Sequence, residues 1–163
     1  DSEEIDVKIS RSALLLMVML LPLAAGLVAT AAIAVAQDGL DDYTPRDIGE
    51  YLIPEAGPAG SAFFTTPDGR HCAIHGTDGT AGCDAVPLGA PPGTDQIRAS
   101  AAVPAHFLDG DWPGFTHPAA RVLPEGHKIT VANSTCGVGY QGTVTCQAGE
   151  HGFTLAATYS VLH

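Results

Sequence analysis

Four cysteines are the residues whose spacing carries the clearest chemistry in this sequence. Cys72 and Cys83 lie on either side of a turn signal, and Cys136 and Cys146 lie on either side of another. If each turn reverses the chain, the two sulfurs of each pair come opposite one another on neighbouring strands. We therefore predict the disulfides Cys72–Cys83 and Cys136–Cys146. Each would close a short loop, which is worth about 3 kcal/mol in the chain-entropy description.

Histidines could also do chemistry, but their spacing does not favour a site. They are scattered along the chain as His71, His75, His106, His117, His127, His151 and His163. His71, Cys72 and His75 are close enough to raise the alternative of a zinc site, yet no paired C-x-x-C spacing accompanies them. Oxidation of the cysteines to disulfides is therefore favoured, and we predict no metal site.

The carboxylates of the sequence and its lack of nucleophile motifs also argue against a catalytic or metal site. Asp109-Gly-Asp111-Trp112 is predicted to be a polar loop with an aromatic anchor, and two carboxylates are too few for a calcium loop. The sequence contains no G-x-S-x-G motif and no glycine-rich phosphate loop. We therefore predict that the protein is not an enzyme and uses no cofactor.

The element that sets the position of everything else is an uncharged stretch near the N-terminus. No charged residue occurs from Ser12 to Gln37, and the apolar body of the stretch covers residues 13–36. At ~1.5 Å per residue that body makes a helix of roughly 36 Å, enough to cross a bilayer core of about 30 Å. Lys8 and Arg11 precede it and acidic residues follow it, which indicates a cytoplasmic N-terminus. We predict a cytoplasmic segment 1–12, a transmembrane helix 13–36 and an exterior remainder.

A cleaved signal peptide is the alternative to this anchor. Ala34-Val35-Ala36 resembles a small-x-small cleavage site. The apolar stretch is longer than the roughly 7–15 residues of a signal-peptide core, so an uncleaved anchor is favoured. The chain begins at Asp1 and not at Met, so we also expect residues upstream.

Small residues in the predicted helix are spaced so that another helix could approach closely. The helix-packing candidates are Ala25, Gly26, Ala29, Thr30, Ala32 and Ala36. The alternative is that alanine and glycine are simply common in membrane spans.

After the anchor we predict a tether at residues 37–62 and a small β-rich domain, an antiparallel sheet or sandwich, at residues 63–163. The tether is rich in Pro, Gly and acidic residues, and its apolar cluster at residues 48–53 is expected to dock partly on the domain. The alternative is a fully solvated tether. In the domain, Phe153–Val161 alternates with a period of two, the strongest strand signal in the chain. Ser100–Leu108 is predicted to be a short helix.

The charge balance excludes one class of partner. The chain has 18 acidic residues against 7 basic ones, and 14 acidic against five basic residues follow the apolar stretch. Nucleic-acid binding needs clustered cations, which are absent from this sequence. An acidic exterior is repelled by anionic headgroups and could attract a basic partner, although plain solubility is the alternative.

Two resemblances concern the exterior part. Phe64–Cys72 fits F-x-x-P-x-G-x-x-C, and Leu123–Gly126, Cys136, Gly142–Cys146 and His151–Phe153 fit L-x-x-G…C…G-x-x-x-C…H-G-F. Over residues 63–160 the chain thereby resembles small secreted or membrane-anchored actinobacterial domains of unknown function. The stretch 87–118 departs from that pattern because it lacks a cysteine often found there. The resemblance implies no catalytic residues.

The anchor with its exterior domain is also similar in architecture to accessory subunits of the actinobacterial respiratory supercomplex, the cytochrome bcc–aa3 oxidase. This implies integral membrane subunits of that respiratory chain as partners and an assembly role without a redox centre. We therefore predict a non-catalytic accessory subunit with its domain on the periplasmic face. The alternative is a free-standing, membrane-anchored binding module for a cell-envelope ligand. An envelope hydrolase is a distant third.

Overall fold

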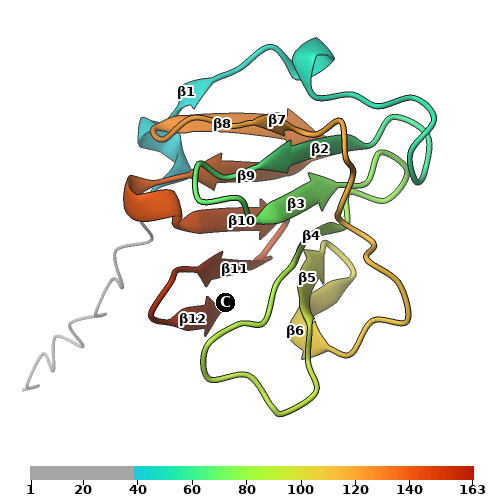
Figure 1. The fold of residues 1–163 in the computed structure, drawn as a ribbon. Coiled ribbons are helices and arrows are strands. Elements are labelled where there is room, and N and C mark those ends of the chain that lie inside the picture. Colours follow the sequence, from blue (N-terminus) through green and yellow to red (C-terminus); the bar gives the residue numbers. More distant parts are fainter. Residues whose placement is uncertain (1–38) are drawn as a thin grey trace, which may run out of the picture. The chain divides into compact units, whose positions relative to one another are not determined.

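The computed structural model describes residues 39–163, which form two six-stranded β-sheets (Figure 1). The strands of sheet A are β1 (Thr44–Pro45), β8 (His127–Val131), β9 (Ser134–Val138), β10 (Val144–Ala148), β11 (His151–Leu155) and β12 (Ser160–Leu162). Those of sheet B are β2 (Ala62–Thr65), β3 (His71–Ile74), β4 (Ala81–Asp84), β5 (Gln96–Ser100), β6 (Val103–Leu108) and β7 (Arg121–Val122). Three short 3-10 helices are η1 (Leu40–Asp42), η2 (Ile48–Glu50) and η3 (Tyr140–Gly142).

Both sheets are mixed rather than purely antiparallel. Their strand orders are β1-β8-β9-β10-β11-β12 and β6-β5-β4-β3-β2-β7. Short hairpin connections make most pairs antiparallel, whereas β1 pairs with β8 and β2 with β7 in parallel. The β-rich domain predicted from the sequence is confirmed at this level.

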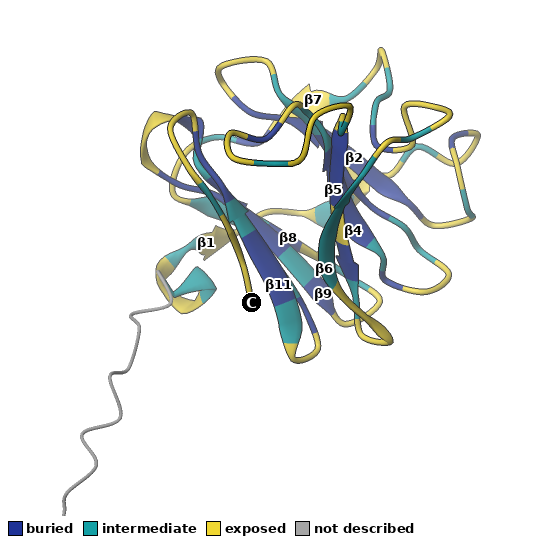
Figure 2. Cartoon of the chain, turned by 90° about the horizontal axis from the view of Figure 1, so that it is seen from below, coloured by how far each residue is buried: buried dark blue, intermediate teal, exposed yellow. Residues whose placement is uncertain are grey.

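The core lies between the two sheets, because alternate side chains of each strand point inward. Figure 2 shows buried residues along strands of both sheets, whereas exposed residues gather mostly in the loops. The largest fully buried side chains of this core include Phe64, Ile74 and Ile97 from sheet B and Val138, Val144 and Phe153 from sheet A. Burial of such side chains is the main favourable term in folding, at about 25 cal/mol per Å² of apolar surface.

Each sheet carries one disulfide that points into this shared core. Cys72 on β3 is directly opposite Cys83 on β4, with 4.0 Å between the Cα atoms. Cys136 on β9 is directly opposite Cys146 on β10, with 4.1 Å between the Cα atoms. The predicted pairing is therefore the one in the structure. Since disulfides persist in oxidising compartments, the two bonds indicate an extracytoplasmic domain.

The turn between β3 and β4 also joins the two sheets. Asp78 accepts hydrogen bonds from the backbone N–H and the hydroxyl of Thr80, both at 2.9 Å. The backbone bond is the main reason that the pKa of Asp78 lies below its ordinary value. The next residue, Gly79, has a φ of 69°, and its carbonyl accepts a 2.6 Å bond from Ser134 on β9. The turn of one sheet is thus held against the other.

Two predicted elements differ from the observed ones. The alternating run at residues 153–161 is not one strand but β11 and β12, because a turn at Ala156–Tyr159 reverses the chain between them. Tyr159 and Val161 are consequently each 45% exposed rather than inward-facing. The predicted helix at Ser100–Leu108 is wrong, since β6 pairs with β5 there. Pairing with a neighbouring strand outweighs the local helix propensity of this segment, since tertiary context commonly overrides propensity.

Most of the predicted tether belongs to the folded unit. Residues Thr44 and Pro45 form β1 on the edge of sheet A, and Tyr51 is only 2% exposed within the core. Tyr51 also donates its hydroxyl to the carbonyl of Val122. Residues 48–53 thus pack closely on the β domain, which begins before the predicted boundary at residue 63.

The predicted transmembrane helix at residues 13–36, with its packing candidates Ala25, Gly26, Ala29, Thr30, Ala32 and Ala36, lies outside the described residues. Within residues 39–163, no helix has the length and apolar character needed to span a bilayer.

We expect each disulfide to stabilise the domain independently. Replacing Cys136 and Cys146 together by alanine should lower the free energy of unfolding by about 3 kcal/mol, since the bond closes a short loop. The matched variant is Cys72→Ala with Cys83→Ala, for which a similar loss is expected because the loop lengths are nearly equal. Urea unfolding of the full chain in detergent measures both, and non-reducing peptide mapping checks the pairing. A peptide joining Cys72 to Cys136 would contradict it.

Candidate functional site

A groove of about 290 Å³ opens beside sheet A at the end where β9 leads into β10. We call it the tyrosine groove. The described residues that line it are Tyr43, Gly139, Tyr140, Gln141, Thr143, Thr145, Ala156, Ala157, Thr158 and Tyr159. None of these residues is charged. The lining therefore combines aromatic rings with neutral hydrogen-bonding groups.

Three of the four tyrosines of the chain meet in this groove. Tyr43 follows η1, Tyr140 belongs to η3 and Tyr159 lies in the turn between β11 and β12. Tyr140 is 79% exposed and Tyr159 is 45% exposed. Exposed aromatic rings that gather around a hollow are typical of recognition surfaces, whereas aromatic rings that serve only stability are buried.

Two glycines of β9 and its following turn provide the surface on which Tyr43 lies. A Cβ atom at Gly137 would come within 2.3 Å of the Tyr43 ring, and one at Gly139 within 2.4 Å of its hydroxyl. Both distances are far below a van der Waals contact, so only glycine permits the ring to lie this close to the strand. The position of Tyr43 is therefore fixed by the backbone of sheet A.

Two pairs of threonines lie on the outer face of sheet A, which also carries Lys128 of β8. Thr145 faces Thr154 across β10 and β11, with 3.2 Å between their hydroxyl oxygens. Thr130 and Thr135 form a similar pair at 2.8 Å on β8 and β9. Such cross-strand threonine pairs stabilise a sheet and leave a surface that both donates and accepts hydrogen bonds.

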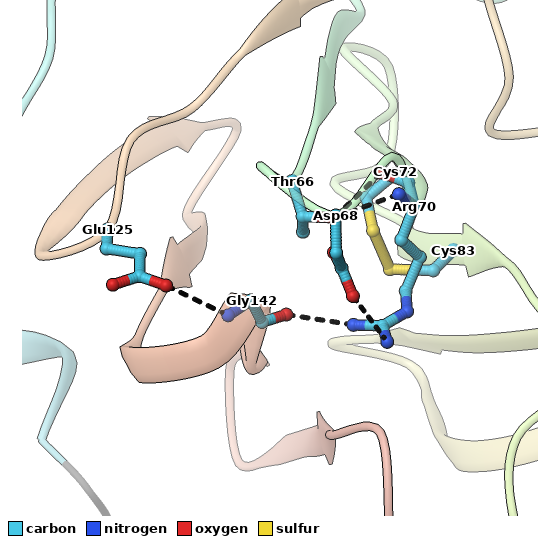
Figure 3. Close-up of polar contacts among 7 residues, drawn as sticks. All are labelled: Thr66, Asp68, Arg70, Cys72, Cys83, Glu125 and Gly142. Atoms are coloured by element: carbon cyan, nitrogen blue, oxygen red, sulfur yellow. Dashed lines mark hydrogen bonds and ion pairs between the residues drawn. A yellow bond between two sulfur atoms is a disulfide. The ribbon is translucent and has the colours of Figure 1, made fainter.

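A polar bridge between the sheets holds η3, and hence Tyr140, in place (Figure 3). Arg70, which follows β2, donates from Nη1 to the carbonyl of Gly142 at 2.8 Å. The N–H of Gly142 donates to Oε1 of Glu125 at 3.2 Å. Asp68 pairs with Nη2 of Arg70 at 3.3 Å and accepts a hydrogen bond from the Thr66 hydroxyl. Both backbone polar groups of Gly142 are thus fixed by side chains from other segments.

The backbone of η3 is strained at Gln141, which lines the groove. Its φ and ψ are 56° and 35°, in the left-handed region that non-glycine residues seldom adopt. Such a conformation costs of order 1–3 kcal/mol and persists only where the surroundings hold it, which happens often at binding sites. Here the strained conformation is held by the polar bridge, which fixes the backbone of the next residue, Gly142.

A second polar cluster lies on the outer face of sheet B. His71 and Asp84 are directly opposite each other on β3 and β4. Oδ2 of Asp84 accepts hydrogen bonds from the N–H of Phe115 at 2.8 Å and from the Thr116 hydroxyl at 2.7 Å. Nδ1 of His71 and Oδ1 of Asp84 are buried without a hydrogen-bond partner. The carboxylate therefore anchors the loop that covers this sheet.

The aromatic anchor of that loop is not the predicted one. Trp112 is 81% exposed, and its backbone carbonyl accepts a hydrogen bond from Gln96 at 2.6 Å. Phe115 is 2% exposed and occupies the space above Gly82, where a Cβ atom would come within 2.3 Å of its ring. His75, one of the weighed metal ligands, stacks on Phe115 with ring centroids 5.1 Å apart.

The histidines and cysteines weighed as metal ligands do not gather into a site, and the groove is what sequence reasoning missed. Among residues 39–163, no group of three or more His, Cys, Asp or Glu side chains is arranged to hold a metal ion. The tyrosines of the groove are 97 and 19 residues apart along the chain, and no motif links them. No protein-family model, curated protein or solved structure matches the chain.

We expect the polar bridge to be sensitive at Gly142. Its φ is 69°, and a Cβ atom there would lie 2.7 Å from Oδ1 of Asp68, so Gly142→Ala strains the backbone and displaces the bridge. Gly126→Ala is the matched control, because Gly126 has a φ of 73° and no heavy atom within 4 Å of its virtual Cβ.

The control should lose roughly 1–2 kcal/mol of stability, the usual cost of a left-handed alanine. The Gly142→Ala variant should lose clearly more in thermal unfolding of the full chain in detergent. Equal losses for the two variants would mean that the bridge does not hold η3.

Proposed function

We propose that this protein is a single-pass, membrane-anchored binding module that holds its β domain outside the cytoplasm and binds a component of the cell envelope without catalysing a reaction. The observation that carries the proposal is the tyrosine groove on a disulfide-braced domain. The groove combines exposed aromatic rings, neutral hydrogen-bonding groups and a backbone that is held in advance. A site that needs no rearrangement loses less free energy on binding.

The anchor in this proposal is the uncharged stretch from Ser12 to Gln37, preceded by Lys8 and Arg11. Its length suits a bilayer span, and the basic residues before it favour a cytoplasmic N-terminus. A domain that follows such an anchor would then be held on the exterior side of the membrane, where envelope material is found. The excess of acidic residues keeps such a domain away from anionic headgroups.

Co-sedimentation with detergent-insoluble envelope material tests this function. The full chain in detergent should pellet with the envelope fraction, and replacing Tyr140 and Tyr159 together by alanine should abolish the effect. Trp112→Ala is the matched control, because Trp112 is as exposed as Tyr140 but lies in the loop over sheet B. Failure of the unaltered protein to pellet, or equal pelleting of the tyrosine variant, would contradict the proposal.

An accessory subunit of a membrane complex is the second candidate, and the free edge of sheet A favours it. β12 is the last strand of that sheet, and Val161 and Leu162 on it are 45% and 40% exposed. An edge strand with exposed apolar side chains is suited to pairing with another chain. The partner in this hypothesis is a set of integral membrane subunits such as those of a cytochrome bcc–aa3 supercomplex.

Purification in mild detergent tests the second candidate. Stoichiometric membrane subunits should co-purify with the full chain, and Val161→Lys should remove them because it places a charge on the edge strand. Val86→Lys is the control, since Val86 is 82% exposed in the loop between β4 and β5. A protein that is always recovered alone would count against this role.

A further inference from the structure

The chemistry of the tyrosine groove narrows the class of ligand. Exposed rings such as those of Tyr140 and Tyr159 present an electron-rich face. That face attracts the weakly positive C–H groups on the flat side of a sugar ring, and stacking also removes apolar surface of both partners from water. Aromatic rings alone would equally suit an apolar ligand, so the polar part of the lining decides between the two.

The polar part of the lining consists of hydroxyl and amide groups. Gln141, Thr143, Thr145 and Thr158 each contain both a donor and an acceptor. Sugar hydroxyl groups also donate and accept at once, so they can satisfy such a lining with any orientation of the proton. The Thr145 hydroxyl already pairs with Thr154, whereas an apolar ligand would remove the exposed amide of Gln141 from water without giving it a partner, which is costly.

Charge argues for a neutral ligand rather than an anionic one. No described residue of the groove is charged, so no lysine or arginine is present there to pair with a phosphate, sulfate or carboxylate. The exterior part of the chain has 14 acidic residues against five basic ones, and its field opposes the approach of an anion. Phosphorylated and acidic polymers are therefore disfavoured.

Size and rigidity complete the argument. The volume of about 290 Å³ is just below the range for small-molecule sites, about 300–1,000 Å³. The groove thus suits a short stretch of a chain, and the hydroxyl-rich face of β10 and β11 continues beside it. The backbone of the strained Gln141 is already held by the contacts of the neighbouring Gly142 before the ligand arrives.

We infer that the tyrosine groove binds an uncharged saccharide of the cell envelope, with Tyr140 and Tyr159 stacking on sugar rings and Gln141 and the threonines contacting their hydroxyl groups. The inference rests on the proposed binding function and specifies its ligand. Tyr140 is the central stacking residue because it is the most exposed aromatic ring of the groove.

The test is binding of the full chain in detergent to immobilised short neutral gluco-, galacto- and manno-oligosaccharides, with sulfated and uronic-acid oligosaccharides as the anionic set. At least one neutral probe should bind and the anionic set should not. Tyr140→Ala should weaken the affinity by about ten-fold or more, the usual loss when an aromatic hot spot is removed. Tyr140→Phe should keep most of the affinity because it keeps the ring, and Trp112→Ala should leave it unchanged.

The inference fails if no neutral probe binds, if the anionic set binds better, or if Tyr140→Ala binds as tightly as the unaltered chain. Envelope co-sedimentation separates this failure from failure of the proposed function. If the tyrosine variant loses envelope binding while no neutral sugar binds, the binding function stands and the saccharide class is wrong. If the protein neither pellets with the envelope nor binds a sugar, both are wrong.

Discussion

The domain depends on two cross-strand disulfides that share one core. Each bond joins directly opposed residues of an antiparallel pair, and all four cysteines are fully buried between the sheets. Few large side chains are available to this core, since aromatic residues make up only 6% of the chain. A small core leaves little margin over the conformational entropy lost on folding, so covalent links that restrict the unfolded chain matter more. They also fix the register of β3 with β4 and of β9 with β10.

The outer faces of the two sheets differ in how far a loop covers them, and this difference decides where a ligand can bind. On sheet B, Phe63, Ala73 and Phe115 form a second apolar cluster under the loop before β7. The buried carboxylate of Asp84 holds that loop by two hydrogen bonds. On sheet A, the tyrosine groove remains at the surface, whereas Thr145 of β10 is 7% exposed and pairs with the half-buried Thr154 of β11. Binding is therefore expected on sheet A, while the outer face of sheet B serves stability.

The groove and the polar bridge are parts of one arrangement. Arg70 and Glu125 come from outside sheet A's β9–β10 connection, yet they hold both backbone groups of Gly142. Through that glycine they hold the backbone of η3, which carries the strained Gln141 and the exposed Tyr140. An exposed aromatic ring on a loose turn would lose conformational entropy on binding, whereas one on a held turn loses less. The charged groups of the bridge thus contact the residue between Gln141 and Thr143, although no lining residue of the groove is itself charged.

The sequence by itself was sufficient to predict several local features of this protein. Turn signals placed symmetrically between cysteines determined the two disulfides, because a short antiparallel hairpin brings opposed residues together. Alternation at residues 153–161 identified β11, since side chains of a half-buried strand face two environments in turn. Three features could not be predicted from the sequence: the break between β11 and β12, the strand at residues 103–108 and the burial of Tyr51. The first two depend on pairing with neighbouring strands, and the third depends on the docking of a segment on the domain. Only the tertiary structure brought Tyr43, Tyr140 and Tyr159 together, since three loops that are distant in sequence meet where sheet pairing places their ends.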